Sequence, residues 1–408
     1  MDLFNTRSVE EAQEILKRLS DDVYIKEEKC ALMDSLHRVL SKPIESPHDV
    51  PGFDRSTVDG YAVKASDTYG ASESMPSMLT YAGEVLMGKP AYISIGAGEC
   101  AYVPTGGMLP EGSDAVVMVE HVEKMDDETI LIHQPITVGA NTLKKGEDIH
   151  QGMVILDRGH KLRPQDLGLL AGMGYQNVTV FQRLKVGIIS TGDEIISPGG
   201  KLEPGKIIDM NTYSLSSAVI EDGCDVYAMA VVPDELDLLK DKMAEMMETC
   251  HLILVSGGSS MGHRDVTKEA IDSLGKPGVV VHGIAVKPGK PTIIGKAEST
   301  LMIGLPGQPV SALVVYRILV RPMLDAVLGN RRFSPTIRGR LTVNVPSAPG
   351  REHYVMVSID EYSDNNHIYP VHGKSGMMSM MSRAQGYIKI EKDQEGLSKG
   401  SEVNVHLF

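Results

Sequence analysis

Between residues 185 and 329 the hydrophobic pattern alternates between short continuous apolar runs and longer amphipathic stretches. Consecutive apolar residues are typical of strands buried on both faces, whereas a 3.6-residue period indicates helices. The predicted strands are 186–189, 226–232, 252–255 and 279–284, and the predicted helices are 212–221, 235–247 and 265–274. Such regular alternation predicts a doubly wound parallel sheet with helices on both faces.

The flanking regions have different patterns. Residues 8–19 predict a helix with a capping box at Ser8 and Glu11, and residues 27–40 and 163–172 predict two further helices. Short, closely spaced strands predict a β-rich region before residue 138, and alternating strands after residue 329 predict a small β-barrel. We therefore expect a framework domain (1–46 and 138–180), an inserted β-rich lid domain (47–137), an α/β domain (181–329) and a C-terminal β-barrel domain (330–408).

Charge and cysteine content exclude several classes of protein. A net charge of −14 argues against broad nucleic-acid binding, so any anionic ligand must be held by local basic groups or a divalent metal. The four cysteines show no CxxC spacing, which indicates neither a zinc site nor a disulfide framework. Without a signal-peptide pattern or an apolar run of about 18 residues, we expect a cytoplasmic protein that does not enter a membrane.

A glycine-rich loop follows the predicted strand 252–255. Ser256, Gly257 and Gly258 begin this loop, and the glycines let the backbone approach a ligand closely. At the end of the loop, Asp265 can cap the following helix, with Thr267 as a second candidate cap. Strand, loop and helix N-terminus suit a phosphate or another oxyanion. Glycine-rich loops of this kind are also common without a ligand, and an Asp at a helix start is often only a cap.

Other predicted strands end in polar residues of both charges. Glu194 lies in Ser190-Thr-Gly-Asp-Glu, Asp234 follows the strand 226–232, and Lys287 and Lys290 follow the strand 279–284. Because ligands gather beyond the carboxyl ends of strands in open α/β sheets, these residues indicate a composite site.

Candidate residues outside the α/β region each have a simpler interpretation. Asp59 precedes Gly60, and Asp-Gly also favours a type I′ hairpin turn. Thr105 lies on a glycine-rich loop, and Asp148 could be an ordinary turn residue. Arg351 and Ser375 stand in two polar turns of the C-terminal region.

Seven segments resemble, in this order, the motifs of the molybdopterin molybdenumtransferase family, which includes the E domain of gephyrin. The matching segments are Pro51-Gly-Phe-Asp-Arg-Ser-Thr-Val-Asp-Gly-Tyr-Ala-Val, Pro104-Thr-Gly-Gly-Met-Leu-Pro, Lys145-Gly-Glu-Asp-Ile, Ser190-Thr-Gly-Asp-Glu, Ser256-Gly-Gly-Ser-Ser-Met-Gly, Lys287-Pro-Gly-Lys-Pro and Leu305-Pro-Gly-Gln-Pro-Val-Ser. The resemblance spans nearly the whole chain, and seven motifs in register are far more specific than one.

The resemblance implies a reaction that takes adenylated molybdopterin and molybdate to molybdenum cofactor and AMP with the help of Mg²⁺. By matching position, it implies Glu194 and Asp265 as metal ligands, and Lys287, Lys290, Arg351 and Ser375 as the oxyanion cradle. The catalytic set that it implies is Asp59, Thr105, Asp148, Asp234 and Asp265. Tungstate has the same charge and nearly the same shape as molybdate, so either oxyanion is expected to bind.

The resemblance also implies a homodimer whose site is shared between subunits, and a contact with the molybdopterin adenylyltransferase. Two alternatives stay open on sequence grounds. The first is the preceding step, adenylation of molybdopterin by ATP, which resembles the Arg264-Asp-Val-Thr segment but needs only one domain. The second is a scaffold without catalysis, as in the receptor-clustering role of gephyrin.

Overall fold

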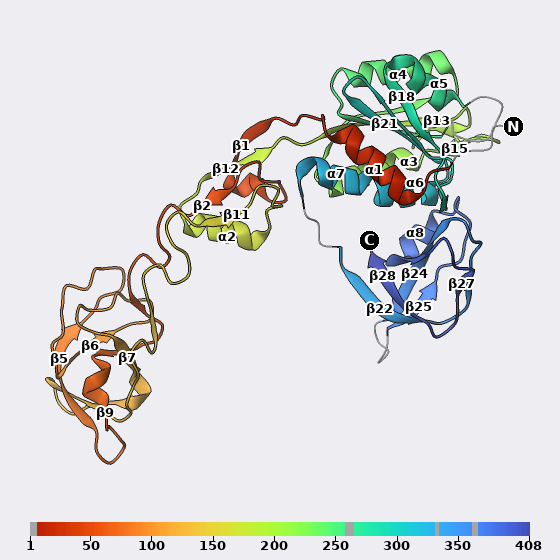
Figure 1. Ribbon diagram of the computed structural model, residues 1–408. Coiled ribbons are helices and arrows are strands. Elements are labelled where there is room, and N and C mark those ends of the chain that lie inside the picture. Colours follow the sequence, from red (N-terminus) through yellow and green to blue (C-terminus); the bar gives the residue numbers. More distant parts are fainter. Residues whose placement is uncertain (1–5, 258–264, 331–333, 361–365) are drawn as a thin grey trace. The chain divides into compact units, whose positions relative to one another are not determined.

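A computed structural model describes residues 6–257, 265–330, 334–360 and 366–408, shown as coloured ribbons in Figure 1. The chain divides into two compact units. The first unit comprises residues 1–42, 158–167 and 176–408, and the second comprises residues 43–157 and 168–175. Each unit is described separately below.

The first unit is built on a six-stranded sheet in the order β16-β13-β17-β21-β20-β18. Its strands are β13 (Lys185–Thr191), β16 (Asp225–Val232), β17 (Leu252–Ser256), β18 (Pro277–His282), β20 (Ile293–Ala297) and β21 (Thr300–Leu305). The first four strands in this order are parallel, and β20 runs antiparallel to both of its neighbours. The predicted strand 279–284 corresponds to β18, which pairs with β20 rather than with a parallel strand, because the chain turns back after β18.

Helices cover both faces of this sheet, as predicted. One face packs Leu252 and Leu254 against α1 (Val9–Ser20), α3 (Asn211–Glu221), α6 (Pro309–Val315) and α7 (Arg321–Leu328), with the π-helical segment Tyr316–Val320 joining the last two. The other face packs Ile253 and Val255 against α4 (Leu236–Met247) and α5 (Val266–Leu274). Every residue of β17 is buried, which explains its continuous apolar run.

The two N-terminal helix predictions had opposite outcomes. The capping box of α1 is confirmed, since Glu11 N donates to Ser8 Oγ at 3.1 Å and Ser8 N donates to Glu11 Oε2 at 2.8 Å. The predicted helix 27–40 is wrong. Residues Glu27–Ala31 form β1, which pairs antiparallel with β12 (Asn177–Phe181), and a short 3₁₀ turn, Leu32–Ser35, follows. His37, with φ of 64°, interrupts any helix through this segment, and the distant partner strand provides the hydrogen bonds instead.

The C-terminal region is a closed five-stranded barrel, as predicted. Its strands are β22 (Thr336–Leu341), β24 (Glu352–Asp360), β25 (His367–Pro370), β26 (Gly386–Ile390) and β28 (Glu402–Leu407). The ring runs β24-β25-β22-β28-β26 and closes through the pairing of β24 with β26. A two-residue strand from the α/β region, β19 (Val286–Lys287), pairs in parallel with Glu352 and His353 at the start of β24. Three minor elements complete the region: α8 (Ser379–Arg383), β23 (Val345–Pro346) and β27 (Gly396–Leu397).

The second unit contains the β-rich region that the sequence predicted. Its main sheet has the order β7-β4-β6-β5-β9-β8. The strands are β4 (Gly60–Val63), β5 (Ser77–Glu84), β6 (Glu99–Val103), β7 (Ala115–Met118), β8 (Val122–Lys124) and β9 (Thr129–Ile132). Short ribbons pair β2 (Ile44–Glu45) with β11 (Val154–Leu156) and β3 (Arg55–Ser56) with β10 (Thr142–Leu143). Helix α2 (Pro164–Gly172) confirms the predicted helix at 163–172.

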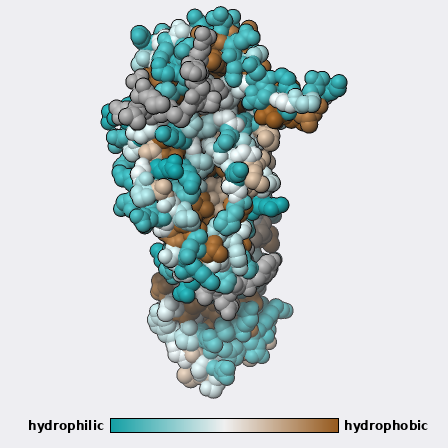
Figure 2. Space-filling view, turned by 90° about the vertical axis from the view of Figure 1, so that its right-hand side faces the viewer, coloured by the Kyte–Doolittle hydropathy of each residue, from teal (hydrophilic) through white to brown (hydrophobic). Residues whose placement is uncertain are grey.

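The helices and the surface show how the hydrophobic residues are distributed in the molecule. Among the described residues, no helix is long and apolar enough to cross a bilayer. On the face that Figure 2 displays, hydrophilic residues predominate and hydrophobic ones form small separate patches.

All four cysteines are free and buried, and burial raises the pKa of Cys100 to about 12 and that of Cys250 to about 11. Such thiols are poor nucleophiles and poor metal ligands at neutral pH.

Candidate active site

The candidate site lies where the connections of the α/β sheet change direction. After β13 the chain crosses to β16 on one side and then returns to β17 on the other, so the loops after β13 and β17 leave the sheet side by side. Such a switch point is where open α/β sheets bind their ligands. We call the loops at this edge the carboxyl rim, which comprises residues 190–194, 233–234, 256–257, 283–292 and 305–308. The loop after β18 belongs to it because His282 pairs with Ile293, which pairs with Gly304 near the end of β21.

Gly257 shows why the loop after β17 needs glycine. Its φ is 112°, and a Cβ atom there would lie 2.1 Å from the carbonyl oxygen of Thr191, so no other residue fits without a backbone shift. Ser256 is buried beside it, and its Oγ donates to the carbonyl oxygen of Pro306 at 3.3 Å. Three rim loops therefore contact one another at this point. Gly258 lies outside the described residues.

The loops after β13 and β16 form an acidic cluster. Thr191 Oγ1 donates to Asp234 Oδ1 at 2.5 Å, and the backbone N–H of Asp234 donates to Asp193 Oδ1 at 3.2 Å. Glu194 is exposed and folds back over Gly192, where a Cβ atom would lie 2.8 Å from Glu194 Oε2. Within the described part of the chain, the Glu194 carboxylate makes no hydrogen bond or ion pair, and it is therefore available to a ligand. Asp193 belongs to the same motif but was not singled out from the sequence.

Asp265 caps α5, as one of the two sequence interpretations predicted. Its Oδ1 accepts from Lys268 N at 3.2 Å, while Thr267 donates to the Gly257 carbonyl and does not cap the helix. Asp265 Oδ2 also lies 2.8 Å from His282 Nε2, a partner on β18 that sequence reasoning missed. No sequence pattern links these two residues, because the packing of α5 against β18 brings them together.

The carboxylates of the rim suit Mg²⁺ in number and type. Among the described residues, no three His, Cys, Asp or Glu side chains form a ready cage for a metal ion. Mg²⁺ does not require one, because it keeps several waters and binds through one or two carboxylates together with substrate phosphates. Glu194 on the loop after β13 and Asp265 at the start of α5 are carboxylates of this kind, and Asp265 also contacts His282.

A positively charged cluster lies at the other end of the rim, where the barrel joins the α/β region. Lys287 stands beside His353 through the β19–β24 pairing. Burial, and then the positive charges of Lys287 and Arg351, lower the pKa of His353 to about 4. Ser375 contacts the start of α6, since its Oγ donates to Gln308 Oε1 and its carbonyl accepts from Val310 N at 3.1 Å.

Lys290 lies three residues after Lys287 on the exposed loop between β18 and β20. Its carbonyl oxygen accepts from Ile284 N at 3.0 Å and from Thr292 N at 2.9 Å, which holds the loop in a tight turn. Gly289 lies at the crowded point of this turn, where a Cβ atom would be 2.4 Å from Val315 Cγ2. The structure therefore places Lys287 at the β19–β24 pairing, Arg351 just before β24, Ser375 against the start of α6 and Lys290 on the loop that follows β19.

The remaining three predicted residues lie in the second unit. Asp59 Oδ1 accepts from the backbone N of Thr105 at 2.7 Å and from its hydroxyl at 3.1 Å, so these two residues form a pair. The turn at Asp59-Gly60 is not of type I′, because neither residue has a positive φ. Gly60 is required for space, since a Cβ atom there would lie 2.2 Å from the carbonyl oxygen of Val117. Asp148 is exposed on a turn.

A second buried network, beneath the rim, was also missed from the sequence. Ser190 Oγ donates to Asp209 Oδ1 at 3.0 Å, and the backbone N of Thr212 donates to the same oxygen at 3.1 Å. Ser190 also lies 2.8 Å from Thr212 Oγ1. Asp209 thus satisfies a free N–H at the start of α3. The available signal was an Asp three residues before Thr212, at the start of the predicted helix.

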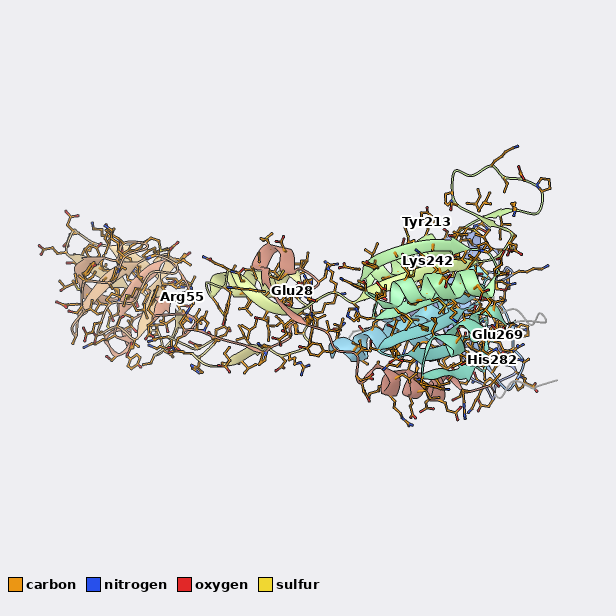
Figure 3. All side chains as sticks on the ribbon, turned by 90° about the horizontal axis from the view of Figure 1, so that it is seen from above. Glu28, Arg55, Tyr213, Lys242, Glu269 and His282 are labelled. Carbon is orange, nitrogen blue, oxygen red and sulfur yellow. The ribbon has the colours of Figure 1, made fainter. Side chains whose placement is uncertain are left out.

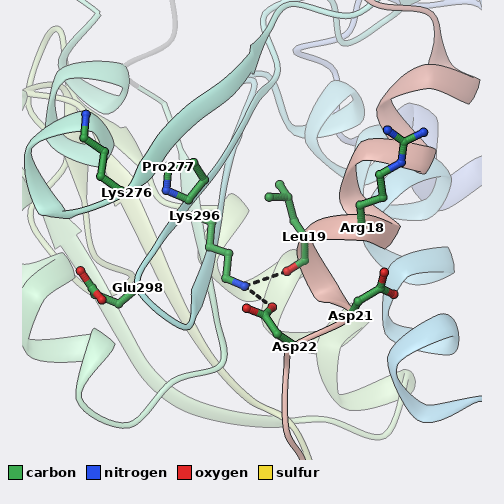
Figure 4. A pocket seen from close by; sticks show the side chains of 8 residues that line it. All are labelled: Arg18, Leu19, Asp21, Asp22, Lys276, Pro277, Lys296 and Glu298. Carbon is green, nitrogen blue, oxygen red and sulfur yellow. Dashed lines mark hydrogen bonds and ion pairs between the residues drawn. The ribbon is translucent and has the colours of Figure 1, made fainter.

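One cavity of about 470 Å³ lies away from these residues. Figure 4 shows it beside Lys296, whose Nζ donates to Asp22 and to the carbonyl oxygen of Leu19 at 2.9 Å. Pro277 and Glu298 also line it, which places it at the opposite end of β18 and β20 from the carboxyl rim. Because its cations and carboxylates are balanced, it offers no clear preference for an anion.

Three family models match consecutive parts of the chain. The MoeA N-terminal region (domain I and II) matches residues 7–174, the probable molybdopterin binding domain matches residues 187–326, and the MoeA C-terminal region (domain IV) matches residues 338–408. Together these models cover the regions that contain all the candidate residues.

Relatives and solved structures agree with these matches over nearly the full length. Molybdopterin molybdenumtransferase of Haemophilus influenzae is 32% identical over 381 residues, which cover 92% of this chain and 93% of that protein. The enzyme of the same name from Bacillus subtilis is 31% identical and covers 93% of this chain and 89% of its own length. A crystal structure of the molybdopterin biosynthesis moeA protein from Pyrococcus horikoshii OT3 has a TM-score of 0.86 at 30% identity, covering 99% of this chain and 100% of that one. The chain therefore belongs to the molybdopterin molybdenumtransferase family, a family of transferases.

Proposed function

We propose that this protein inserts molybdenum into adenylated molybdopterin, with molybdate as the second substrate and AMP as a product. The observation that supports this function best is the division of the carboxyl rim. Carboxylates lie on the loops after β13 and β16, and the cations Lys287 and Arg351 lie where the barrel joins the sheet. A substrate with a metal-binding phosphoanhydride and a co-substrate that is a dianion require both kinds of environment in one site.

The cationic cluster would hold the oxyanion. Molybdate carries two negative charges, and a unit charge pair at 4 Å contributes about 4 kcal/mol at an effective dielectric constant near 20. Lys287, Lys290 and Arg351 supply the opposite charge, and the Ser375 hydroxyl supplies a hydrogen bond. Tungstate meets the same requirements, and we propose that it binds to the same cradle.

The glycine loop and the carboxylates would hold the phosphoanhydride between molybdopterin and AMP. The lack of side chains at Gly257 and Gly258 lets phosphate oxygens approach the backbone, next to Ser256. Glu194 and Asp265 would hold Mg²⁺, which when bound neutralises charge on the phosphate oxygens as the anhydride is cleaved. Asp234 lies within the acidic cluster and would orient the attacking water or the pterin.

Asp59 and Thr105 would act from the lid domain and Asp148 from the adjoining framework segment, closing over the substrate and ordering it. This role requires the four domains that we propose: framework (1–46 and 138–180), lid (47–137), α/β (181–329) and barrel (330–408). We also propose a homodimer in which the lid of one subunit completes the rim of the other, and a contact with the adenylyltransferase that supplies the substrate. Four free, buried cysteines support a reducing, cytoplasmic location.

Release of AMP tests the function directly. Purified protein, adenylated molybdopterin and Mg²⁺ should release AMP only when molybdate or tungstate is added. Molybdopterin with Mg-ATP should give no pyrophosphate, which would be the product of an adenylyltransferase. Absence of oxyanion-dependent AMP release from a folded protein would leave the scaffold as the better explanation.

Subunit complementation tests the shared site. Asp59→Ala and Asp265→Ala chains are each expected to be inactive, whereas a mixture of the two should contain heterodimers with one intact site. Recovery of about a quarter of the wild-type AMP release is expected from random pairing, because half the dimers would then hold one of two sites. No recovery at all from a verified heterodimer would contradict the shared site.

A further inference from the structure

Asn211, the first residue of α3, lies buried beneath the carboxyl rim and is 7% exposed. Its Nδ2 donates two hydrogen bonds, to Ser256 Oγ at 2.7 Å and to the carbonyl oxygen of Gly307 at 2.7 Å. A backbone carbonyl only accepts hydrogen bonds, so the contact with Gly307 fixes which end of the amide carries the nitrogen. The Oδ1 atom therefore points away from both partners.

Asn211 Oδ1 is a buried acceptor without a hydrogen bond from the described part of the chain. Buried polar atoms are nearly always satisfied, and leaving one without a partner is costly. Both donors of the same side chain are used, at two different loops of the rim, so the amide is held firmly in this orientation. A fixed, buried and unsatisfied acceptor at this position suits a donor group from a ligand.

The charges around Asn211 determine what kind of group it can accept. The N-terminus of α3 would ordinarily attract an anion, but the Asp209 carboxylate is 6% exposed and already accepts from Thr212 N there. Asp234 and Asp193 add further acceptor oxygens on the neighbouring loops. At Asn211 Oδ1 itself, an oxygen of a phosphate or molybdate would face a lone pair, whereas an uncharged N–H donor would be favoured.

Lys287 and Arg351 lie beyond β18, which β20 separates from β21, whereas Asn211 contacts the loops after β17 and β21. Figure 3 labels Tyr213 on α3 and His282 on β18, which lie toward opposite edges of the α/β sheet. Helix α3 packs on β13 and β16, whereas Lys287 and Arg351 follow β18 and precede β24. A substrate with a neutral ring at one end and anionic groups at the other can match both environments in only one direction.

We propose that Asn211 Oδ1 accepts a hydrogen bond from an N–H group on the neutral heterocycle of the substrate and thereby sets the direction in which the substrate binds. The inference rests on the proposed function for the nature of this heterocycle. Two rings of adenylated molybdopterin have the required chemistry: the pterin, through its 2-amino and ring N–H groups, and the adenine, through its 6-amino group. Asn211 acts as a specificity and positioning residue, because it touches a part of the substrate that does not react.

Two pairs of ligands test the proposal without turnover. The first pair is 6-hydroxymethylpterin and its 2-dimethylamino analogue, and the second is AMP and N6,N6-dimethyl-AMP. Affinities would be measured calorimetrically for the wild type and for Asn211→Ala. In the pair whose ring occupies the site, the wild type should prefer the N–H parent by about three- to tenfold, the usual effect of one hydrogen bond. Asn211→Ala should lose that preference and bind the two members of the pair equally.

The controls separate a binding role from a structural one. Thr300→Ala removes a buried hydrogen bond, of 3.2 Å to the Cys250 carbonyl, at the far end of the strands and should keep the preference. If Asn211→Ala does not fold, the affinities of the wild type alone still test the proposal. A wild type that shows no preference for the N–H parent in either pair overturns it. Retention of the preference by folded Asn211→Ala also overturns it. Since no step of catalysis is measured, a ring preference without AMP release would refute the proposed function and leave this inference intact.

Discussion

The two ends of the carboxyl rim differ in both charge and construction. At the α3 end, Asp209, Asn211 and Asp234 present oxygen atoms that belong to the α/β region alone. At the β19 end, Lys287 is placed beside Arg351 and His353 only because a strand of the barrel pairs with the loop after β18. In a chain with a net charge of −14, the oxyanion site that we propose therefore depends on a few cations placed where two folding regions meet.

The largest effect is expected from Glu194→Gln, which removes one hard ligand for Mg²⁺ and keeps the shape of the side chain. Loss of metal-assisted charge stabilisation should lower AMP release by roughly a hundredfold, corresponding to about 3 kcal/mol. Glu203→Gln, an exposed residue whose carboxylate lies 3.6 Å from Lys201, is the matched control. Unchanged AMP release in a folded Glu194→Gln protein would show that Glu194, at the acidic end of the rim, takes no part in the reaction.

The next largest effect is expected at the cationic end of the rim, on the binding of molybdate. Lys287→Ala should weaken binding of molybdate by roughly tenfold to a hundredfold, because a hydrogen bond to a charged group contributes about 1.5 to 3 kcal/mol. Lys276→Ala removes a lysine of the distant cavity and should leave molybdate binding unchanged. The concentration of molybdate that gives half-maximal AMP release measures both variants, and equal values for the two would contradict the cradle.

Asp265→Asn separates the two roles of that residue. Asn is as good a helix cap as Asp, so the free energy of unfolding should change by less than about 1 kcal/mol, the limit for a partly exposed ion pair with His282. AMP release should nevertheless fall about tenfold or more, since an amide binds Mg²⁺ more weakly than a carboxylate. Urea unfolding and the AMP assay measure the two quantities, and a loss of stability without a loss of activity would make Asp265 only a cap.

The last prediction is a pH dependence of stability, and it does not involve the reaction. The pKa of His353 is about 4 in the folded protein and 6.5 for an ordinary histidine, so only the unfolded chain takes up the proton between these values. The free energy of unfolding should therefore decrease as pH falls from 6.5 towards 4, and His353→Gln should reduce that decrease. In Lys287→Ala the NMR-measured pKa of His353 should rise towards 6.5. No change would mean that the lysine lies farther from His353 than the β19–β24 pairing indicates.

The sequence predicted the elements whose pattern is local. The apolar run 252–255, the helix after Asp265 and the Ser8–Glu11 capping box depend on neighbouring residues, and each was found where the pattern placed it. The helix predicted at 27–40 failed because its apolar residues satisfy a helical period, while the partner strand 177–181 lies about 150 residues away in sequence. Long-range pairing of this kind has no local signal.

Prediction of the candidate site from the sequence has the same limit, because it also depends on local patterns. Motifs located Glu194, Lys287 and Asp59, because glycine-rich turns mark the loops that carry them. His282 and Asn211 were not found, since neither stands in a glycine-rich motif and each acquires its partners only when the strands are aligned in the sheet. The hydrophobic pattern also did not predict the antiparallel direction of β20, because a continuous apolar run fits a strand of either direction.

The pairing of β19 with β24 has one more consequence, for the α/β region taken on its own. The two residues of β19 dock the barrel and also include the lysine assigned to the oxyanion, so the barrel cannot be removed without dismantling the cradle. A free-standing copy of the α/β region would retain Asn211, the glycine loop, the acidic residues and both lysines, but not Arg351 and Ser375 of the barrel. In such a chain Lys287 would lose the neighbouring strand that now fixes its position, so the complete set of groups assigned to the oxyanion exists only in a chain that carries the barrel.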